Sequence, residues 1–386
     1  MINPLTGGLE FHKEVVINEN SKITDIHDID INKNFNPLPS LLNLKERVNI
    51  IKSVGEEIIQ ENEIELLCKN KLMPIVYDGF EPSGRMHIAQ GIMRTINVNK
   101  LVKAGCQFVF WVADWFALLN NKLGGDIDKI KTTGRYFVEI WKAAGMDLRN
   151  VKFLWCSDEI SKNSYEYWSR VIDIARKNTF DRIMRCNQIM GRSDKDSVYC
   201  SMVMYPCMQC SDIFFLKADI CQLGMDQRKV NMLAREYCDD IKKEDKPIII
   251  SHHMLAGLDG EKMSKTNPDA AIFMEDTPED VKRKIKKALC PPGTIENNPV
   301  WEYIKYIVFE AVGYFNLSQR DGDDIKYTNL DDLVKDINAN KVHPGDMKAS
   351  VTKHINELLD PVRKHFETDP YANKLLELVK QFRISK

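Results

Sequence analysis

Short runs of hydrophobic residues alternate along the chain with longer segments in which hydrophobic positions recur every three or four residues. The runs at residues 71–76, 106–113, 151–156, 213–223 and 247–252 have the length and composition of buried strands. Because strands and helices alternate, the pattern predicts an α/β fold, built as a Rossmann-like, doubly wound parallel sheet with right-handed crossovers.

The periodic segments predict the helices that cover this sheet. They lie at residues 41–59, 61–69, 92–104, 126–144, 201–212 and 224–241. A polar helical stretch at 161–190 forms, together with 201–212, a predicted helical insertion between the two halves of the sheet. Beyond residue 266 an amphipathic segment at 278–289 and an apolar one at 301–315 predict a mainly α-helical C-terminal domain.

The composition narrows the class of protein. Of the 386 residues, 44% are hydrophobic and 28% charged, and the formal net charge is −2, so any contact with RNA must come from a local basic patch. The longest hydrophobic run, at 109–119, contains Asp114 and is too short to span a membrane. Ten cysteines without a secretory segment predict reduced thiols and a cytoplasmic location.

One candidate for an anion site is the stretch YDGFEPSGRMHIAQG at residues 77–91. It follows the first predicted strand and precedes a helix, and helix N-termini offer unpaired N–H groups and the positive end of a dipole. His87 lies near that N-terminus, where it can donate to a phosphate. By itself the pattern fits a purely structural turn equally well.

A second candidate is KMSKT at residues 262–266. It follows the polar, glycine-containing run 257–261, so its two lysines are predicted to lie on a flexible loop that can close over a ligand. For an isolated lysine pair, a solvated surface loop is the more common explanation.

In combination, the two stretches resemble the HxGH and KMSKS motifs of class I aminoacyl-tRNA synthetases, with HIAQ and KMSKT in their places. YPCMQCSD at residues 205–212 and QLGMDQRK at 222–229 narrow the resemblance to tyrosyl-tRNA synthetases of the archaeal and eukaryotic cytosolic kind. The resemblance extends from about residue 41 to the C-terminus.

A group of polar residues is the candidate amino-acid site. Tyr205, Gln209 and Asp212 share one face if their segment is helical, which from spacing alone fits a buried hydrogen-bond cluster as well as a ligand site. The resemblance implies that Asp212 and Tyr77 contact the phenol hydroxyl of tyrosine. It also implies that Tyr205, Gln209 and Gln227 hold the α-amino end.

For ATP, the resemblance implies that Gly79 and Gly91 allow close approach of the nucleotide and that Asp226 accepts from the ribose hydroxyls. His87 and Gln90 would donate towards phosphate. Glutamine carries no charge, so the role of the second histidine of the family motif is only partly replaced.

The lysine loop would complete the nucleotide site. Lys262 and Lys265 would close over the pyrophosphate, with Met263 and Ser264 between them in contact with ATP. Mg²⁺ is expected through the ATP phosphates and water, without a dedicated protein site. The Cys207-x-x-Cys210 pair has no partner pair at zinc spacing, so a structural role is predicted for it.

We therefore predict three units. These are a partly disordered extension at 1–40, a catalytic domain at 41–265 with a dimerisation insertion at about 157–212, and an anticodon-binding domain at 266–386. The resemblance implies a homodimer that partners tRNA(Tyr), with no membrane association.

The predicted reaction joins L-tyrosine and ATP into tyrosyl-AMP, releases pyrophosphate, and transfers tyrosine to the 3′-terminal adenosine of tRNA(Tyr). The nearest alternative is a tryptophanyl-tRNA synthetase, which shares the fold and both motifs. The Tyr77 and Asp212 pair argues against it, because a phenol hydroxyl needs a donor and an acceptor whereas an indole N–H only donates. A catalytically silent, RNA-binding relative is the other alternative.

Overall fold

The central element of the computed structural model is a six-stranded sheet. The structure describes residues 29–190, 199–261, 263, 267–320 and 322–382. The sheet has the order β1-β6-β5-β2-β3-β4, in which five strands are parallel and the edge strand β1 is antiparallel to β6. The strands are β1 Glu57–Ile59, β2 Ile75–Phe80, β3 Gln107–Val112, β4 Val151–Trp155, β5 Ile220–Gly224 and β6 Ile248–His252.

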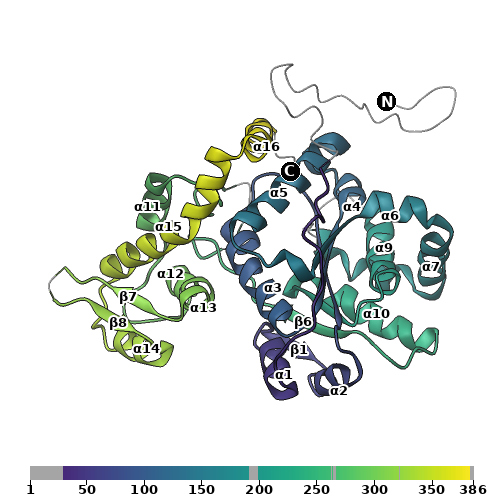
Figure 1. Ribbon diagram of the computed structural model, residues 1–386, viewed down its shortest axis with the longest axis horizontal. Coiled ribbons are helices and arrows are strands. Elements are labelled where there is room, and N and C mark those ends of the chain that lie inside the picture. The colour runs from purple at the N-terminus through teal and green to yellow at the C-terminus, as the bar shows by residue number, and fades with distance from the viewer. Residues whose placement is uncertain (1–28, 191–198, 262, 264–266, 321, 383–386) are drawn as a thin grey trace.

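Helices cover both faces of the sheet (Figure 1). They are α1 Leu44–Lys52, α2 Glu63–Asn70, the π-helix η1 Ala89–Met93, α3 Arg94–Lys103, α4 Asp114–Leu119, α5 Ile127–Ala143, α6 Cys156–Lys162, α7 Ser164–Lys177, α8 Phe180–Met184, α9 Ser201–Phe215 and α10 Arg228–Asp240. Short 3-10 turns lie at Lys122–Gly125, Leu148–Asn150, Asn187–Met190 and Met225–Gln227. Helices α6 to α9 form the predicted insertion between β4 and β5.

The order of the strands determines where a ligand-binding crevice is expected. Along the chain the parallel strands run β2, β3, β4 in one direction from the centre of the sheet and β5, β6 in the other. In such doubly wound sheets the connections leave to opposite faces on either side of this switch point, and ligands bind beyond the carboxyl ends of the strands there. The switch point of this sheet lies between β2 and β5.

The alternation of side chains along the strands divides the core between the two faces. On β3, Phe108 and Phe110 join the cluster on one face, whereas Trp111 joins the cluster on the other. On the first face the rings of Phe110, Trp141 of α5 and Phe153 of β4 contact one another, with ring centroids 4.6 Å apart for Phe110 and Trp141 and 5.3 Å apart for Phe110 and Phe153. These aromatic contacts explain the phenylalanines of β3 and β4 on this face of the sheet.

The C-terminal part of the chain lies to one side of the sheet in Figure 1. It contains α11 Pro278–Lys287, α12 Pro299–Tyr303, the π-helix η6 Ile304–Phe309, α13 Glu310–Val312, the hairpin strands β7 Phe315–Leu317 and β8 Ile325–Tyr327, α14 Leu330–Asn338, α15 Pro344–Thr368 and α16 Pro370–Gln381. Their buried side chains belong to the same hydrophobic cluster as Phe110 and Val76. The sheet and the C-terminal helices therefore share one continuous core.

Four sequence predictions of local structure were wrong. The strand predicted at 213–223 begins only at Ile220, because residues up to Phe215 continue helix α9. The segment from Tyr77 to Phe80 is the second half of strand β2, paired with β3 residue by residue, and not a turn. Residues 57–59 end the first predicted helix early, because they form the edge strand β1 against β6. The helix predicted at 301–315 ends sooner, and Phe315 begins strand β7.

Residues 29–40 are fixed against the far edge of the sheet. Asn32 exchanges two hydrogen bonds with the backbone of Phe153 in β4, at 2.8 and 2.9 Å, and Leu38 exchanges two with the side chain of Asn150. The described part of the predicted extension is therefore ordered. Residues 1–28 lie outside the described residues.

Candidate active site

A cavity of about 600 Å³ opens at the switch point of the sheet. Its walls come from the carboxyl ends of β2, β5 and β6, from η1, from α9 and from the segment before the lysine loop. Ten of the predicted site residues line it: Tyr77, Gly79, His87, Gln90, Tyr205, Gln209, Asp212, Asp226, Gln227 and Met263. The strand topology thus brings together motifs that are up to 186 positions apart in the sequence.

Asp212 lies at the buried end of this cavity. Its segment is helical, so Asp212 shares the inner face of α9 with Tyr205 and Gln209, as the spacing predicts. Tyr167 Oη of α7 donates to Asp212 Oδ1 at 2.7 Å. Burial raises the pKa of Asp212 well above its usual range, and the hydrogen bond from Tyr167 acts in the opposite direction.

Tyr77 faces the same end of the cavity from strand β2. The side chain is 1% exposed, and burial, followed by the nearby Asp212 carboxyl, raises the pKa of the phenol well above its usual range. The phenol therefore stays protonated and can donate. A donor from the sheet and an acceptor from α9 therefore line the same cavity, close enough for the carboxyl to affect the pKa of the phenol.

A chain of hydrogen bonds lines the wall next to Asp212. Gln209 Nε2 donates to Gln227 Oε1 at 2.9 Å, and Gln227 Nε2 donates to Asp226 Oδ1 at 3.2 Å. Gln227 and Asp226 belong to the short turn after β5, where the switch point lies. The chain fixes the orientation of both amides and leads from the buried end of the cavity towards its mouth.

Glu81 was not predicted as a site residue, although it belongs to the 77–91 stretch. Tyr205 Oη donates to Glu81 Oε1 at 2.5 Å, and Asn120 Nδ2 lies 3.1 Å from both carboxylate oxygens. Lys122 Nζ approaches Glu81 Oε2 at 3.7 Å. The Glu81 carboxylate adds negative charge to this wall of the cavity. That charge favours the binding of an ammonium group of a ligand beside it.

His87 and Gln90 lie at the start of the π-helix η1. Gln90 O accepts from Trp141 Nε1 at 2.7 Å, which ties this turn to the aromatic core. The backbone of His87 forms an isolated antiparallel bridge with Phe273, a residue from beyond the lysine loop. Both side chains line the cavity, so the helix start presents two groups that can donate towards a phosphate.

An ion pair lies in the wall of the cavity. Arg94 Nη1 approaches Asp78 Oδ2 at 2.9 Å, and both residues are among those that line the cavity. Asp78 is 1% exposed, and burial raises its pKa to about 6 against the opposing effect of Arg94. Neither residue was predicted from the sequence as a site residue.

The two histidines at the end of β6 have different environments. His252 is buried and its Nδ1 lies 2.8 Å from Gln222 Nε2, and burial lowers its pKa to about 3, so the ring is neutral near pH 7. His253 stacks on Tyr306 with ring centroids 4.0 Å apart. It also approaches Glu302 of α12 at 3.2 Å, which links the end of β6 to the C-terminal helices.

Comparison with known proteins identifies the family. The family model described as tRNA synthetases class I (W and Y) matches residues 69–360. The chain belongs to this class I tRNA synthetase family. Two relatives of this synthetase come from Arabidopsis thaliana. It is 55% identical over 347 residues to tyrosine–tRNA ligase 1, cytoplasmic, with 89% of this chain and 90% of that protein covered.

The other two comparisons involve longer proteins. The synthetase is 53% identical over 370 residues to tyrosine–tRNA ligase 2, cytoplasmic, of Arabidopsis, covering 94% of this chain and 50% of that protein. Among solved structures, the tyrosyl-tRNA synthetase of Leishmania major in complex with tyrosinol matches with a TM-score of 0.84 and 50% identity. That match covers 89% of this chain and 61% of the Leishmania chain.

Gly91 of the synthetase does not line the cavity, although the sequence prediction placed it next to the nucleotide. A Cβ atom at this position would lie 2.1 Å from Met274 Sδ. Gly91 therefore allows η1 to pack against the segment after the lysine loop. At Gly79, which does line the cavity, a Cβ would lie 3.0 Å from Tyr77 Oη, so this glycine leaves room for the phenol.

The lysine loop is described only in part. Lys262, Ser264 and Lys265 lie outside the described residues of the synthetase.

Cys207 and Cys210 are buried in α9, and of all ten cysteines only Cys200 is exposed. Within the described ranges, no helix is long and apolar enough to cross a membrane.

Proposed function

We propose that the protein is a tyrosine–tRNA ligase, which forms tyrosyl-AMP from L-tyrosine and ATP and then tyrosylates tRNA(Tyr). The observation that carries the choice of amino acid is the meeting of Tyr77 and Asp212 at the buried end of the cavity. A phenol hydroxyl both donates and accepts, and this site offers a phenol to donate and a carboxyl to accept. The relatives named above are tyrosine enzymes.

The other end of the amino acid fits the middle of the cavity. An α-ammonium group can donate to Gln209 and Tyr205, and the Glu81 carboxylate behind Tyr205 favours its positive charge. The amides of Gln209 and Gln227 are held by the chain that ends at Asp226. Such preorganisation lowers the cost of orienting the substrate.

Adenylate formation needs positioning and charge stabilisation more than proton transfer. The carboxylate of tyrosine attacks the α-phosphorus of ATP, a new C–O–P linkage forms, and the bond to the β-phosphate oxygen breaks to release pyrophosphate. Because the nucleophile is already an anion, no protein base is required. His87 and Gln90 donate to the phosphates, Asp226 accepts from the ribose, and Lys262 and Lys265 neutralise the developing charge.

Magnesium is proposed to accompany ATP. Among the described residues no group of three or more His, Cys, Asp or Glu side chains is arranged to hold a metal ion. A cation that is bound through the phosphates and water fits this arrangement, since Mg²⁺ keeps several of its waters in such sites.

For tRNA, we assign the anticodon to the C-terminal unit, residues 266–386, and the acceptor end to the cavity. Helix α11 supports this assignment because its solvent face carries exposed cations that can contact phosphates. They are Lys282, Arg283, Lys286 and Lys287. The proposed location is the cytoplasm, which the names of both plant relatives include.

We further propose a homodimer that forms through the insertion at about 157–212. Large hydrophobic side chains are exposed on α7, on α8 and around the start of α9, where a partner subunit would cover them. They are Tyr165, Ile172, Phe180, Tyr199 and Met204.

The test is amino-acid-dependent exchange of pyrophosphate into ATP by the purified protein, without tRNA. Exchange with tyrosine, and neither tryptophan nor phenylalanine, is the expected result. Exchange with tryptophan would make the protein a tryptophanyl enzyme. If folded protein that binds tRNA exchanged with no amino acid, the catalytically silent alternative would replace our proposal.

A further inference from the structure

We propose that Asp276 and Arg363 are positioning residues for adenylate formation. They hold the backbone of residues 272–274, to which both the first motif and the lysine loop are attached. The inference rests on the proposed function. It makes helix α15, in the C-terminal unit, necessary for a reaction step that uses no tRNA.

The first motif is paired directly with this segment. Ile88 N donates to Ile272 O at 2.8 Å, and Met274 N donates to Met86 O at 2.9 Å. His87 lies between these two bonds and forms the antiparallel bridge with Phe273. A shift of residues 272–274 therefore moves the backbone of His87 at the mouth of the cavity.

The same segment anchors the lysine loop. Leu258 N donates to Ala270 O at 2.8 Å, so the loop leaves and returns at one point, two residues before Ile272. Across the loop, Asn267 Nδ2 donates to Asp259 Oδ2 at 3.0 Å. The described residues on either side of KMSKT are thus fixed to each other and lead directly into the segment that is paired with His87.

Asp276 fixes the conformation of the segment. The side chain is 4% exposed. Asp276 Oδ2 accepts from the backbone N of Phe273 at 2.9 Å and from Lys284 Nζ of α11 at 2.6 Å. Asp276 Oδ1 accepts from Arg85 Nη2, two residues before His87, at 3.0 Å. The buried carboxylate of Asp276 therefore connects the first motif, residues 272–274 and helix α11.

The charges around Phe273 strengthen this arrangement. The guanidinium of Arg85 lies 4.3 Å from the centroid of the Phe273 ring, and Lys284 Nζ lies 4.8 Å from it. Cations within about 6 Å of an aromatic face are attracted to it. Arg85 also pairs with Glu275, which accepts from Tyr136 Oη of α5 at 2.9 Å. The segment is held from several sides.

Arg363 brings α15 into this cluster. Its Nε donates to the backbone O of Asp276 at 2.7 Å, and its Nη2 donates to Asn356 Oδ1 of the same helix at 2.6 Å. Asn356 therefore orients the guanidinium, and the guanidinium holds the turn at Asp276. Neither hydrogen-bond partner of Arg363 lines the cavity, so Arg363 acts by positioning other residues.

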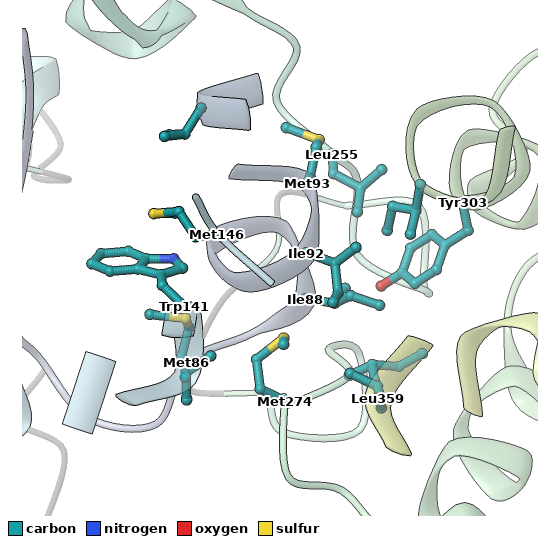
Figure 2. Close-up of a cluster of buried hydrophobic side chains, with 14 of the residues drawn as sticks. Met86, Ile88, Ile92, Met93, Trp141, Met146, Leu255, Met274, Tyr303 and Leu359 are labelled. Carbon is teal, nitrogen blue, oxygen red and sulfur yellow. The ribbon is translucent and has the colours of Figure 1, made fainter. Parts of the chain in front are cut away.

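Apolar contacts reinforce the polar ones. Figure 2 shows Ile88 of the first motif and Ile92 of η1 pointing towards Tyr303 of α12. Met274 and, from α15, Leu359 lie next to them. All of these side chains belong to the core cluster that joins the sheet to the C-terminal helices. Tyr77 and Tyr205 of the amino-acid site belong to the cluster on the other side of the sheet. A change at Arg363 should therefore spare tyrosine binding.

The experiment compares Arg363→Met with the wild type in tyrosine-dependent pyrophosphate exchange without tRNA. We expect kcat to fall roughly 10- to 100-fold, since displacement of reacting groups by about 1 Å costs this much, while KM for tyrosine stays unchanged. Arg363→Lys keeps one donor and should recover part of the loss. Asn356→Ala, which only loosens the guanidinium, should show a smaller loss in kcat.

Lys364→Met is the matched control. Lys364 is the next residue of α15, and its partner Asp360 is half exposed, so this variant loses the same charge without touching Asp276. It should retain wild-type exchange. Any of three results would overturn the inference. They are a loss of kcat in Lys364→Met equal to that in Arg363→Met, an unchanged kcat in both Arg363→Met and Asn356→Ala, and a rise in KM for tyrosine that accompanies the loss of kcat. A wild type without exchange would instead remove the proposed function, and this inference with it.

Discussion

At the scale of single residues, we expect Asp212 to select the amino acid. In an Asp212→Ala variant the tyrosine hydroxyl loses its acceptor, whereas phenylalanine loses nothing, so discrimination against phenylalanine should fall. A hydrogen bond is worth roughly 1 kcal/mol or more, so we expect at least a fivefold to tenfold change in the ratio of kcat/KM values. Pyrophosphate exchange with each amino acid measures it.

Two further variants make this prediction sharper. Tyr167→Phe removes the hydroxyl that donates to Asp212 but leaves the carboxyl, so a smaller loss of discrimination is expected. Ser211→Ala changes a buried neighbour in α9 that does not line the cavity, and it should leave discrimination unchanged. Full selectivity in Asp212→Ala would show that the phenol hydroxyl is recognised elsewhere.

Asp78 gives a prediction about pH. Burial raises its pKa to about 6, above the value of 3.8 expected in the unfolded chain. Between these values the folded state binds the proton more tightly, so the free energy of unfolding falls as pH rises. The fall should total about 2 kcal/mol between pH 4 and pH 7, because the full pKa difference is worth roughly 3 kcal/mol, at about 1.4 kcal/mol for each pKa unit, and part of it lies below pH 4.

The Asp78→Asn variant isolates this effect. It lacks the titrating group, so the free energy of unfolding of the wild type minus that of the variant should decrease across the same pH range. Urea unfolding of both proteins at several pH values provides the measurement. A difference that is constant or increases with pH would contradict the assignment.

The candidate site was largely predictable residue by residue where a motif marked it. Tyr77, Gln209 and Asp212 line one cavity, but nothing in the sequence indicated that Tyr167 would donate to Asp212. Glu81 was missed although it lies within the first motif. Which polar groups meet across a cavity depends on how α7, α9 and β2 are packed, and spacing along one segment carries no information about the other segments.

At the scale of elements, the π-helix η1 depends on a residue without a side chain. In Gly91→Ala the new Cβ would overlap Met274, so we expect a loss of about 1–3 kcal/mol in the free energy of unfolding, as is typical of overpacking. Urea unfolding measures the loss. The loss should be smaller when Gly91→Ala is introduced into Met274→Ala, and equal losses in both backgrounds would contradict the proposed contact.

Strands that are hydrophobic throughout were predictable, whereas boundaries set by tertiary contacts were not. β3 and β6 are buried on both faces, so their composition alone identifies them. β2 extends through Asp78 and Gly79, residue types that favour turns, because its pairing with β3 outweighs local preference. β1 is three residues long, and its antiparallel pairing with β6 leaves no local pattern.

At the scale of the whole molecule, the exposed hydrophobic residues of the insertion predict the oligomeric state. Ile172 of α7 is 63% exposed, and Ile172→Glu should convert a dimer into a monomer because a charge would be buried at the interface. Light scattering after size-exclusion chromatography measures the mass. Leu66→Glu is the control, since Leu66 of α2 is 60% exposed and lies outside the insertion. A wild-type monomer would refute the proposal.

The ten thiols differ in their accessibility, and Cys200 is the one that is exposed. Burial raises the pKa of Cys207 to about 11, and the thiols of Cys156 and Cys210 are likewise held in their protonated, unreactive form. Cys200 is exposed, immediately before α9, and lies between Tyr199 and Met204, which the proposed partner subunit would cover. A maleimide dye added at neutral pH should therefore attach at this position first in the Ile172→Glu monomer, and more slowly in the dimeric wild type.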